Sequence, residues 1–160
     1  IYAEVAGFGM SAAAHHLTMP LSNGAAKAMR GALADGRITP EDVGYVNAHG
    51  TATQANDAME SDAIRTVFGT HTDSLAVSST KSMHGHALGA AGAIESAATI
   101  LAIHNKVLPP TANFNEADPE CALDVIPNEA RPATVEAAIS NSFAFGGLNA
   151  VVAFRRWHGK

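Results

Sequence analysis

Two short apolar segments, each followed at once by a polar turn that contains histidine, constrain the fold of this sequence most. The first is YVNAHGTAT, residues 45–53, and the second is AVSSTKSMHGHALG, residues 76–89. Short apolar runs that end at glycine or polar residues are typical of buried strands, and segments of helical periodicity lie between and after them. Strands that alternate with helices predict an α/β fold with a mixed β-sheet layered with helices.

The boundaries of the other elements follow from periodicity and turn residues. Ser22 and Asn23 are expected to cap the first helix, and the third helix is expected to begin at about His86. In the second helix, polar residues that include Glu60 are expected to face solvent. The expected helices cover 24–36, 56–68 and 86–105, and the expected strands cover 1–9, 43–48, 74–80, an edge segment at 122–127 and a hairpin within 137–156.

The composition limits the classes of function. Hydrophobic residues make up 47% of the chain and charged residues 16%, so we expect much surface to be buried inside or against a partner. A formal charge of −5 without a long basic run argues against nucleic acid as a partner. The single cysteine, Cys121, favours a reducing compartment, with the cytoplasm as the default.

The ends and the hydropathy of the sequence carry two further expectations. No stretch is apolar over the ~18 to 20 residues that a membrane-spanning helix needs, so we expect no membrane span. The chain starts without Met, inside an expected strand, which indicates a piece of a longer protein.

The histidines of the two turns are the first candidates for chemistry. Ligands of α/β sheets bind at the carboxyl ends of strands, so His49 and the pair His84 and His86 are expected to converge on one pocket. At the first turn of a helix, His86 would be kept neutral and able to donate an N–H to an oxyanion. Spacing alone makes His84 and His86 nearly equal candidates for the catalytic histidine. Lys81 is expected to hold a neighbouring charge or to orient a carboxylate.

Other ligand classes receive weaker support from the sequence. The glycines of 85–92 do not match dinucleotide-binding spacing and are expected to allow close helix packing, which leaves Glu95 as a carboxylate in need of Lys81 or a cation. Zinc binding by three histidines lacks accompanying Asp, Cys or an H-E-x-x-H pattern. Cys121 lies in a loop without a cationic activator, so it is interpreted as a small hydrophobic residue.

Three motifs resemble those of a known family. NAHGTAT, SSTKSMHGHALGAAGAIE and NSFAFGGLN, in this order and spacing, resemble the C-terminal half of the β-ketoacyl-[acyl-carrier-protein] synthases, particularly the synthase II type of bacterial fatty-acid synthesis. The resemblance covers essentially the whole chain. It implies a thiolase-like fold, of which residues 1–160 form the C-terminal half, and a homodimer whose nucleophilic cysteine belongs to an N-terminal half that this sequence lacks.

The resemblance also implies a reaction and its residues. An acyl chain would be extended from malonyl-acyl carrier protein by decarboxylative Claisen condensation, and the chain alone would be inactive. His49 and His86 would bind the malonyl thioester carbonyl and stabilise the enolate, while Lys81 and Glu95 organise the site. His84 stands where the family usually has threonine or another residue.

Substrate and ion contacts are implied in the same way. No covalently bound cofactor is expected, and the phosphopantetheine arm of acyl carrier protein is the substrate carrier. Its implied contacts are Thr51, Thr53 and Thr18. The implied gate loop beside the cysteine is formed by Phe145, Gly146 and Gly147. A sodium or potassium ion, held in some members, would be bound by Asn47, Glu95, Ser140 and Asn141.

Two residues of the gate region depart from the family pattern. Ala144 replaces a usual glycine, which is expected to restrict conformations with positive φ and so reduce gate mobility. Leu148 replaces the threonine of FGGTN, which is expected to change acyl preference or to mark a divergent subgroup. A polyketide-type synthase and a non-catalytic partner subunit are the alternatives, and the intact His49, His86 and Lys81 argue against the second.

Overall fold

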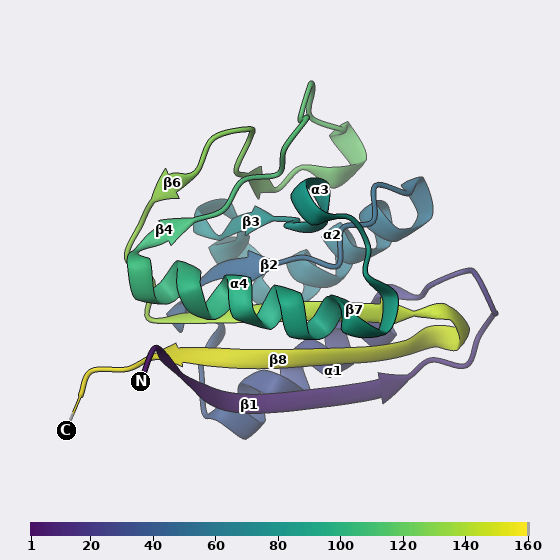
Figure 1. The fold of residues 1–160 in the computed structure, drawn as a ribbon. Helices are drawn as coiled ribbons and strands as arrows, with labels where there is room; N and C mark the ends of the chain where they lie inside the picture. Colours follow the sequence, from purple (N-terminus) through teal and green to yellow (C-terminus); the bar gives the residue numbers. More distant parts are fainter. Residues whose placement is uncertain (160) are drawn as a thin grey trace.

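The computed structural model describes residues 1–159, which form a six-stranded sheet with helices on both faces (Figure 1). In sheet order the strands are β1 (Ala3–Ala12), β8 (Leu148–Arg156), β7 (Ala137–Ala144), β2 (Val43–Asn47), β3 (Ala76–Ser78) and β5 (Asp124–Val125). β7, β2, β3 and β5 pair in parallel, whereas β8 is antiparallel to both β7 and β1. The predicted mixed sheet is confirmed.

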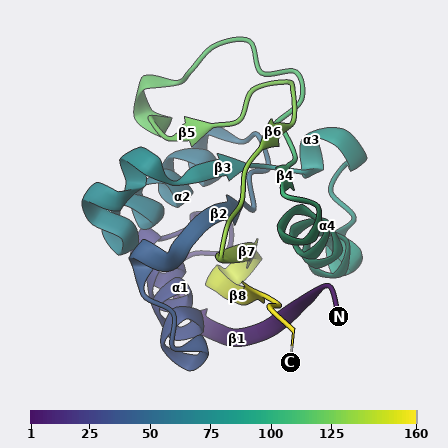
Figure 2. The same cartoon turned by 90° about the vertical axis from the view of Figure 1, so that its left-hand side faces the viewer.

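Helices cover the two faces of the sheet unequally: α1 and α2 lie on one face and α4 on the other (Figure 2). The helices are α1 (Ser22–Gly36), α2 (Gln54–Phe68), the single turn α3 (Lys81–His84) and α4 (Ala91–Asn105), and a separate two-stranded sheet joins β4 (Val107–Leu108) to β6 (Arg131–Pro132). Met29 of α1 and Ile64 of α2 are fully buried in one apolar cluster, and Ile103 of α4 packs with Tyr45 of β2 in the other. The layers therefore follow the predicted periodicity.

Two glycines of β1 allow α1 to approach the strand closely. A Cβ atom on Gly9 would overlap Ala28 O and Ala32 N of α1, and a Cβ atom on Gly7 would overlap Ala32 O. Main chain therefore packs directly on main chain at these two positions, because no side chain fits between the strand and the helix.

We expect the substitution Gly9→Ala to lower the free energy of unfolding by roughly 1–3 kcal/mol, because the added methyl forces the α1 main chain away from β1. The substitution Gly89→Ala is the matched control, since a Cβ atom there meets nothing within 4 Å. Urea unfolding followed by circular dichroism measures both effects. Equal stability losses in the two variants would contradict this account of β1.

The third helix begins later than predicted. After α3, His86 lies in an irregular connection, a 3-10 turn follows at Leu88–Ala90, and α4 starts only at Ala91. Gly85 has a φ of 78° and Leu88 a φ of 50°, and two such left-handed residues interrupt a right-handed helix. The prediction of a helix from His86 is therefore wrong.

Two smaller predictions are also wrong. Leu21, not Ser22 or Asn23, is at the N-cap of α1, and no side chain caps this helix; the N–H groups of Gly24 and Ala25 instead bond to Leu21 O. The close packing expected of the glycines of 85–92 is not seen at Gly85 and Gly89, where an added Cβ atom meets nothing within 4 Å. These two glycines belong to the connection before α4, whereas a Cβ atom on Gly92 of α4 would lie 3.6 Å from Ser142 Oγ, an ordinary contact.

Large apolar side chains remain exposed on the α4 side of the sheet. Phe8 and Met10 of β1 are 50% and 63% exposed, on the opposite side of the strand from Gly7 and Gly9. Leu101 on the outer side of α4 is 47% exposed. Across residues 1–159, no helix has both the length and the apolar character to cross a membrane.

Candidate active site

A buried carboxylate, that of Glu60 on α2, fixes the turn that follows β2. Its Oε1 accepts the main-chain N–H of His49 at 2.8 Å and the side-chain amide of Asn141 at 2.9 Å. Its Oε2 accepts the N–H of Gly50 at 2.8 Å. The Glu60 side chain therefore binds the main chain of the turn that contains His49, and it joins this turn to β7.

The prediction that Glu60 faces solvent is wrong, because only 3% of the residue is exposed. Burial raises the pKa of the Glu60 carboxyl, and the hydrogen bonds from Gly50, Asn141 and His49 oppose that rise. One signal in the sequence marks this position. Glu60 precedes the buried Ala63 and Ile64 by three and four residues, so it shares their face of the helix.

The structure brings the two histidine turns together. The rings of His49 and His86 lie edge to face, with centroids 5.4 Å apart and planes at 85°, and Phe143 of β7 packs beside His49 at 5.6 Å. Burial, with smaller contributions from Lys81 and His86, lowers the pKa of His49 to about 3. His49 is therefore a neutral imidazole at physiological pH.

The pKa of His49 predicts a pH dependence of stability. Between the ordinary value of 6.5 and about 3, the unfolded chain binds a proton at His49 that the folded chain does not bind, so stability is lost as the pH falls through this window. We expect His49→Gln to flatten that part of the pH profile of unfolding free energy. The exposed His15 provides the control, and His15→Gln is expected to retain the wild-type slope.

His86 is fixed as one tautomer. The main-chain N–H of Leu88 donates to His86 Nδ1 at 3.3 Å, so Nδ1 is the acceptor nitrogen and the proton of the neutral ring lies on Nε2. An Nε2–H group is then available for a ligand. The prediction that a position in the first turn of a helix keeps His86 neutral is wrong, because His86 precedes the 3-10 turn and lies outside the first turn of α4.

Lys81 and Glu95 form a buried ion pair, and Lys81 contributes to the lowered pKa of His49. Lys81 begins α3 and Glu95 lies on α4, and their side chains are 4% and 0% exposed. Glu95 therefore has the lysine partner that its apolar surroundings require, and the pair joins α3 to α4.

An apolar cavity of about 1010 Å³ opens beside the two histidines. Leu17, Met19 and Leu148 contribute to its apolar lining. The hydroxyls of Thr51 and Thr53 lie 2.9 Å apart at its polar side. Of the predicted substrate-binding residues, the cavity is lined by Thr18, Thr51, Thr53, Phe145 and Gly147.

The Phe145–Gly147 turn is held against the loop that follows β1. Gly146 N donates to Leu17 O at 2.8 Å, and a Cβ atom on Gly147, whose φ is 77°, would lie 2.9 Å from Ala13 Cβ. Ala144 has a φ of −132°, which is extended backbone that any residue adopts. This conformation therefore does not need a glycine at position 144, and reduced gate mobility remains a prediction.

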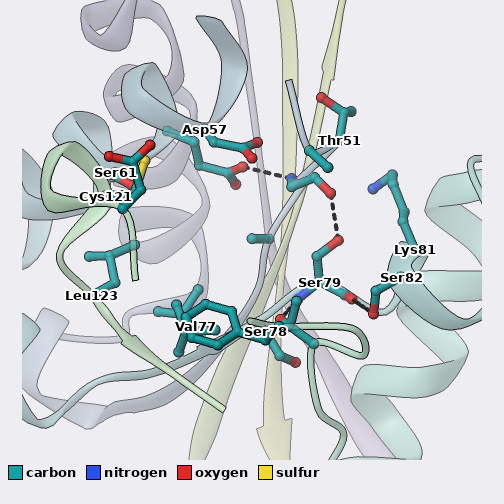
Figure 3. Close-up of a pocket in the computed structure, with 18 of the residues that line it drawn as sticks. Thr51, Asp57, Ser61, Val77, Ser78, Ser79, Lys81, Ser82, Cys121 and Leu123 are labelled. Atoms are coloured by element: carbon teal, nitrogen blue, oxygen red, sulfur yellow. Dashed lines mark hydrogen bonds between the residues drawn. The ribbon is translucent and has the colours of Figure 1, made fainter. Parts of the chain in front are cut away.

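A second cavity of about 930 Å³, more polar than the first, adjoins it (Figure 3). Thr51 and His86 line both cavities, so they form part of the wall between them. The Ser79 hydroxyl donates to Gly50 O at 2.7 Å. Lys81 and Cys121 lie on opposite sides of this cavity in Figure 3. Burial is the largest cause of a raised pKa of the Cys121 thiol, which disfavours a nucleophilic thiolate.

Several buried oxygen atoms fit the predicted monovalent cation. Glu95 Oε2, Ser140 Oγ and Asn141 Oδ1 have no hydrogen-bond partner within residues 1–159, whereas Glu95 Oε1 is paired with Lys81. Oxygen donors of this kind suit sodium or potassium. The Asn47 amide is already engaged, since its Nδ2 donates to Glu95 O and Thr99 Oγ1 and its Oδ1 accepts from Thr80.

This chain is similar to known proteins in both sequence and structure. Nodulation protein E of Rhizobium sp. (strain N33) is 55% identical over 98% of this chain and 39% of its own length. The 3-oxoacyl-[acyl-carrier-protein] synthase 2 of Coxiella burnetii (strain RSA 493 / Nine Mile phase I) is 50% identical over 98% of this chain and 38% of its own length. This chain thus spans about two-fifths of the length of these curated relatives.

A solved structure gives the same fold. A type II polyketide ketosynthase, in complex with its acyl-carrier protein, superposes with a TM-score of 0.95 at 40% identity, over 98% of this chain and 39% of that one. The fold is the thiolase-like α/β fold of ketosynthases. Residues 2–115 match the family described as beta-ketoacyl synthase, C-terminal domain. With more than half of its residues matched, the chain belongs to the beta-ketoacyl synthase family.

Proposed function

We propose that this chain supplies the malonyl-thioester site of a 3-oxoacyl-[acyl-carrier-protein] synthase that elongates acyl chains in fatty-acid synthesis. The pair of His49 and His86 carries the proposal. One ring is kept neutral by burial, the other is fixed with its proton on Nε2, and both lie beside an apolar cavity. Two neutral imidazoles are suited to donate N–H bonds to one thioester oxygen.

The chemistry follows from these two donors. His49 and His86 hold the carbonyl oxygen of the malonyl thioester, and loss of CO2 leaves the electron pair of the broken C–C bond as an enolate. The N–H donors stabilise the negative enolate oxygen. The enolate carbon then attacks the carbonyl of a cysteine-bound acyl chain, a new C–C bond forms, and the C–S bond breaks with release of the thiolate.

Three threonines support a role of the apolar cavity in holding the phosphopantetheine arm. Thr18, Thr51 and Thr53 line a cavity that is otherwise mostly apolar, as suits an arm with amides and a methylated carbon chain. Phe145, which is 77% exposed, and Gly147 line the same cavity, and together with Gly146 they would form the gate. Lys81 and Glu95 form a buried ion pair without net charge, and this pair would help to position the histidines.

The cysteine nucleophile belongs, in this proposal, to an N-terminal half of the whole protein. This assignment is supported by an exposed apolar face that the N-terminal half would cover, formed by Phe8, Met10 and Leu101. The whole protein would be a homodimer that acts with acyl carrier protein in the cytoplasm. A sodium or potassium ion at Glu95, Ser140 and Asn141 would supply a fixed positive charge in the buried part of the site.

The proposal is tested by giving the whole protein an acyl donor and malonyl-acyl carrier protein, and by analysing the carrier-bound products by mass spectrometry. We expect a 3-oxoacyl product that is two carbons longer than the donor, with one CO2 released for each condensation. Release of CO2 without a longer product, or no reaction at all, would contradict the proposed function.

A polyketide-type synthase is the second candidate, supported by the similarity to a type II polyketide ketosynthase. The same assay separates the two activities when no reductase is present. A fatty-acid synthase would stop after one extension, whereas a polyketide synthase would accumulate products with several unreduced keto groups.

A further inference from the structure

Ser79 links the two turns that carry the candidate catalytic histidines. It follows β3 directly, and its hydroxyl donates to Gly50 O at 2.7 Å (Figure 3). Gly50 is the residue that follows His49. Ser79 begins the segment that leads through α3 to His86. Among residues 1–159, no other group donates a hydrogen bond to Gly50 O, so this bond is the one that joins the two turns through that oxygen.

The main chain of Ser79 is held on both sides. Its N–H donates to Thr111 Oγ1 at 3.0 Å. Its carbonyl oxygen accepts the Ser82 hydroxyl at 2.8 Å, and Ser82 Oγ in turn accepts the N–H of Ala112 at 2.8 Å. Only 8% of Ser79 is exposed, so water has little access to its bond with Gly50. The Ser79 hydroxyl therefore extends from a main chain that is fixed in place.

Gly50 is held by two side chains from different elements. Glu60 Oε2 accepts its N–H at 2.8 Å, and Ser79 donates to its carbonyl oxygen. The approach of Ser79 is close, because a Cβ atom on Gly50 would lie 2.5 Å from Ser79 Cβ. Glu60 thus places the turn that carries His49 relative to α2, whereas Ser79 places it relative to the turn after β3.

A second hydroxyl bond joins the same two strands away from the turns. Tyr45 OH of β2 lies 2.8 Å from Ser78 Oγ of β3, and both side chains are buried. Both residues belong to the strands themselves, before the turns begin. This bond links β2 to β3 without reaching the turns of His49 and His86, so its removal is a matched control for removal of the Ser79 bond.

We propose that Ser79 is a positioning residue for the reaction proposed above: its bond to Gly50 sets the placement of the His49 ring relative to the His86 ring. The two rings lie edge to face with centroids 5.4 Å apart. Two N–H donors stabilise one enolate oxygen only when both point to the same place, and a misplacement of about 1 Å can remove a large part of the rate. The effect on catalysis rests on the proposed function, whereas the placement of the rings is measurable without it.

Crystal structures of the whole protein test the placement of the rings. Ser79→Ala removes the hydroxyl, and we expect the Gly50 carbonyl to turn away from β3 and the separation of the His49 and His86 rings to change. Tyr45→Phe removes the other hydroxyl bond and is expected to keep the wild-type separation. Wild-type placement of the two rings in Ser79→Ala would overturn the proposal, whatever the activity of the protein.

Decarboxylation of malonyl-acyl carrier protein by the whole protein tests the effect on catalysis. We expect Ser79→Ala to lower kcat roughly three- to tenfold with KM unchanged, because the lost hydrogen bond displaces a donor that acts in the transition state. Ser79→Cys carries a weaker donor on a side chain of similar size, and its kcat is expected to lie between those of Ser79→Ala and the wild type. Tyr45→Phe is expected to keep the wild-type kcat.

A double variant separates positioning from general destabilisation. Because Ser79 acts through His49, adding Ser79→Ala to His49→Ala is expected to leave the residual kcat unchanged. A further loss of about threefold or more in that background, or equal losses in Ser79→Ala and Tyr45→Phe, would overturn the positioning role. If even the wild type is inactive, the proposed function fails, while the crystal structures still decide the placement of the rings.

Discussion

Replacing His86 by alanine is expected to lower kcat/KM for malonyl-thioester decarboxylation by about 10²–10³-fold, and His49→Ala is expected to have an effect of similar size. Each substitution removes one N–H donor from the enolate oxygen, and a lost oxyanion donor costs about 2.7–4 kcal/mol of transition-state stabilisation. The loss is expected in kcat more than in KM, because the charge on the oxygen develops only during the reaction. Release of labelled CO2 from malonyl-acyl carrier protein by the whole protein measures it.

His15→Ala is the control for this experiment, because His15 lies in an exposed loop. It is expected to leave decarboxylation unchanged. The double variant of His49 and His86 is expected to be less impaired than the product of the two single effects, since both rings serve one oxygen. Near-normal decarboxylation in either single variant would show that the corresponding ring is not an oxyanion donor.

Replacing Lys81 by methionine is expected to lower the free energy of unfolding by about 3–5 kcal/mol, because it removes the side chain that is paired with the buried Glu95 carboxylate. Glu95 is 0% exposed, so water cannot replace the lysine without rearrangement of α4. Urea unfolding at neutral pH measures this loss. The double variant Lys81→Met with Glu95→Leu is expected to recover most of the stability, since it removes both charges.

An exposed pair of the same chemistry is the control. Arg131 and Asp124 form an ion pair whose side chains are 37% and 36% exposed. We expect Arg131→Met to lower the free energy of unfolding by only about 0–1 kcal/mol. Equal losses in Arg131→Met and Lys81→Met would show that burial does not set the strength of the Lys81–Glu95 interaction.

Periodicity and turn residues were sufficient to predict the main elements of this fold. Strand β2 ends at Asn47 and helix α2 ends at Phe68, each within one residue of its predicted end, because glycine follows closely after both. The hairpin of β7 and β8 follows from alternating apolar residues around a glycine turn. Such features are encoded locally, so a single sequence reveals them.

Other features depend on residues that are distant in the sequence. The burial of Glu60 is explained only by the N–H groups of His49 and Gly50 and by Asn141 of β7. The glycines of β1 are required by the main chain of α1, which no local pattern indicates. For His86, the motif identified the residue, whereas the reason for its tautomer lies in the N–H of Leu88.

The Glu60 carboxylate holds the residue at position 49 by its main chain, and this has a consequence for protein engineering. Because both hydrogen bonds are donated by backbone N–H groups, they do not depend on which side chain position 49 carries. Position 50 is restricted, since a Cβ atom there would crowd Ser79. The backbone at position 49 is therefore held in a fixed orientation, and side chains with other functional groups can be introduced there to give this fold a different chemistry.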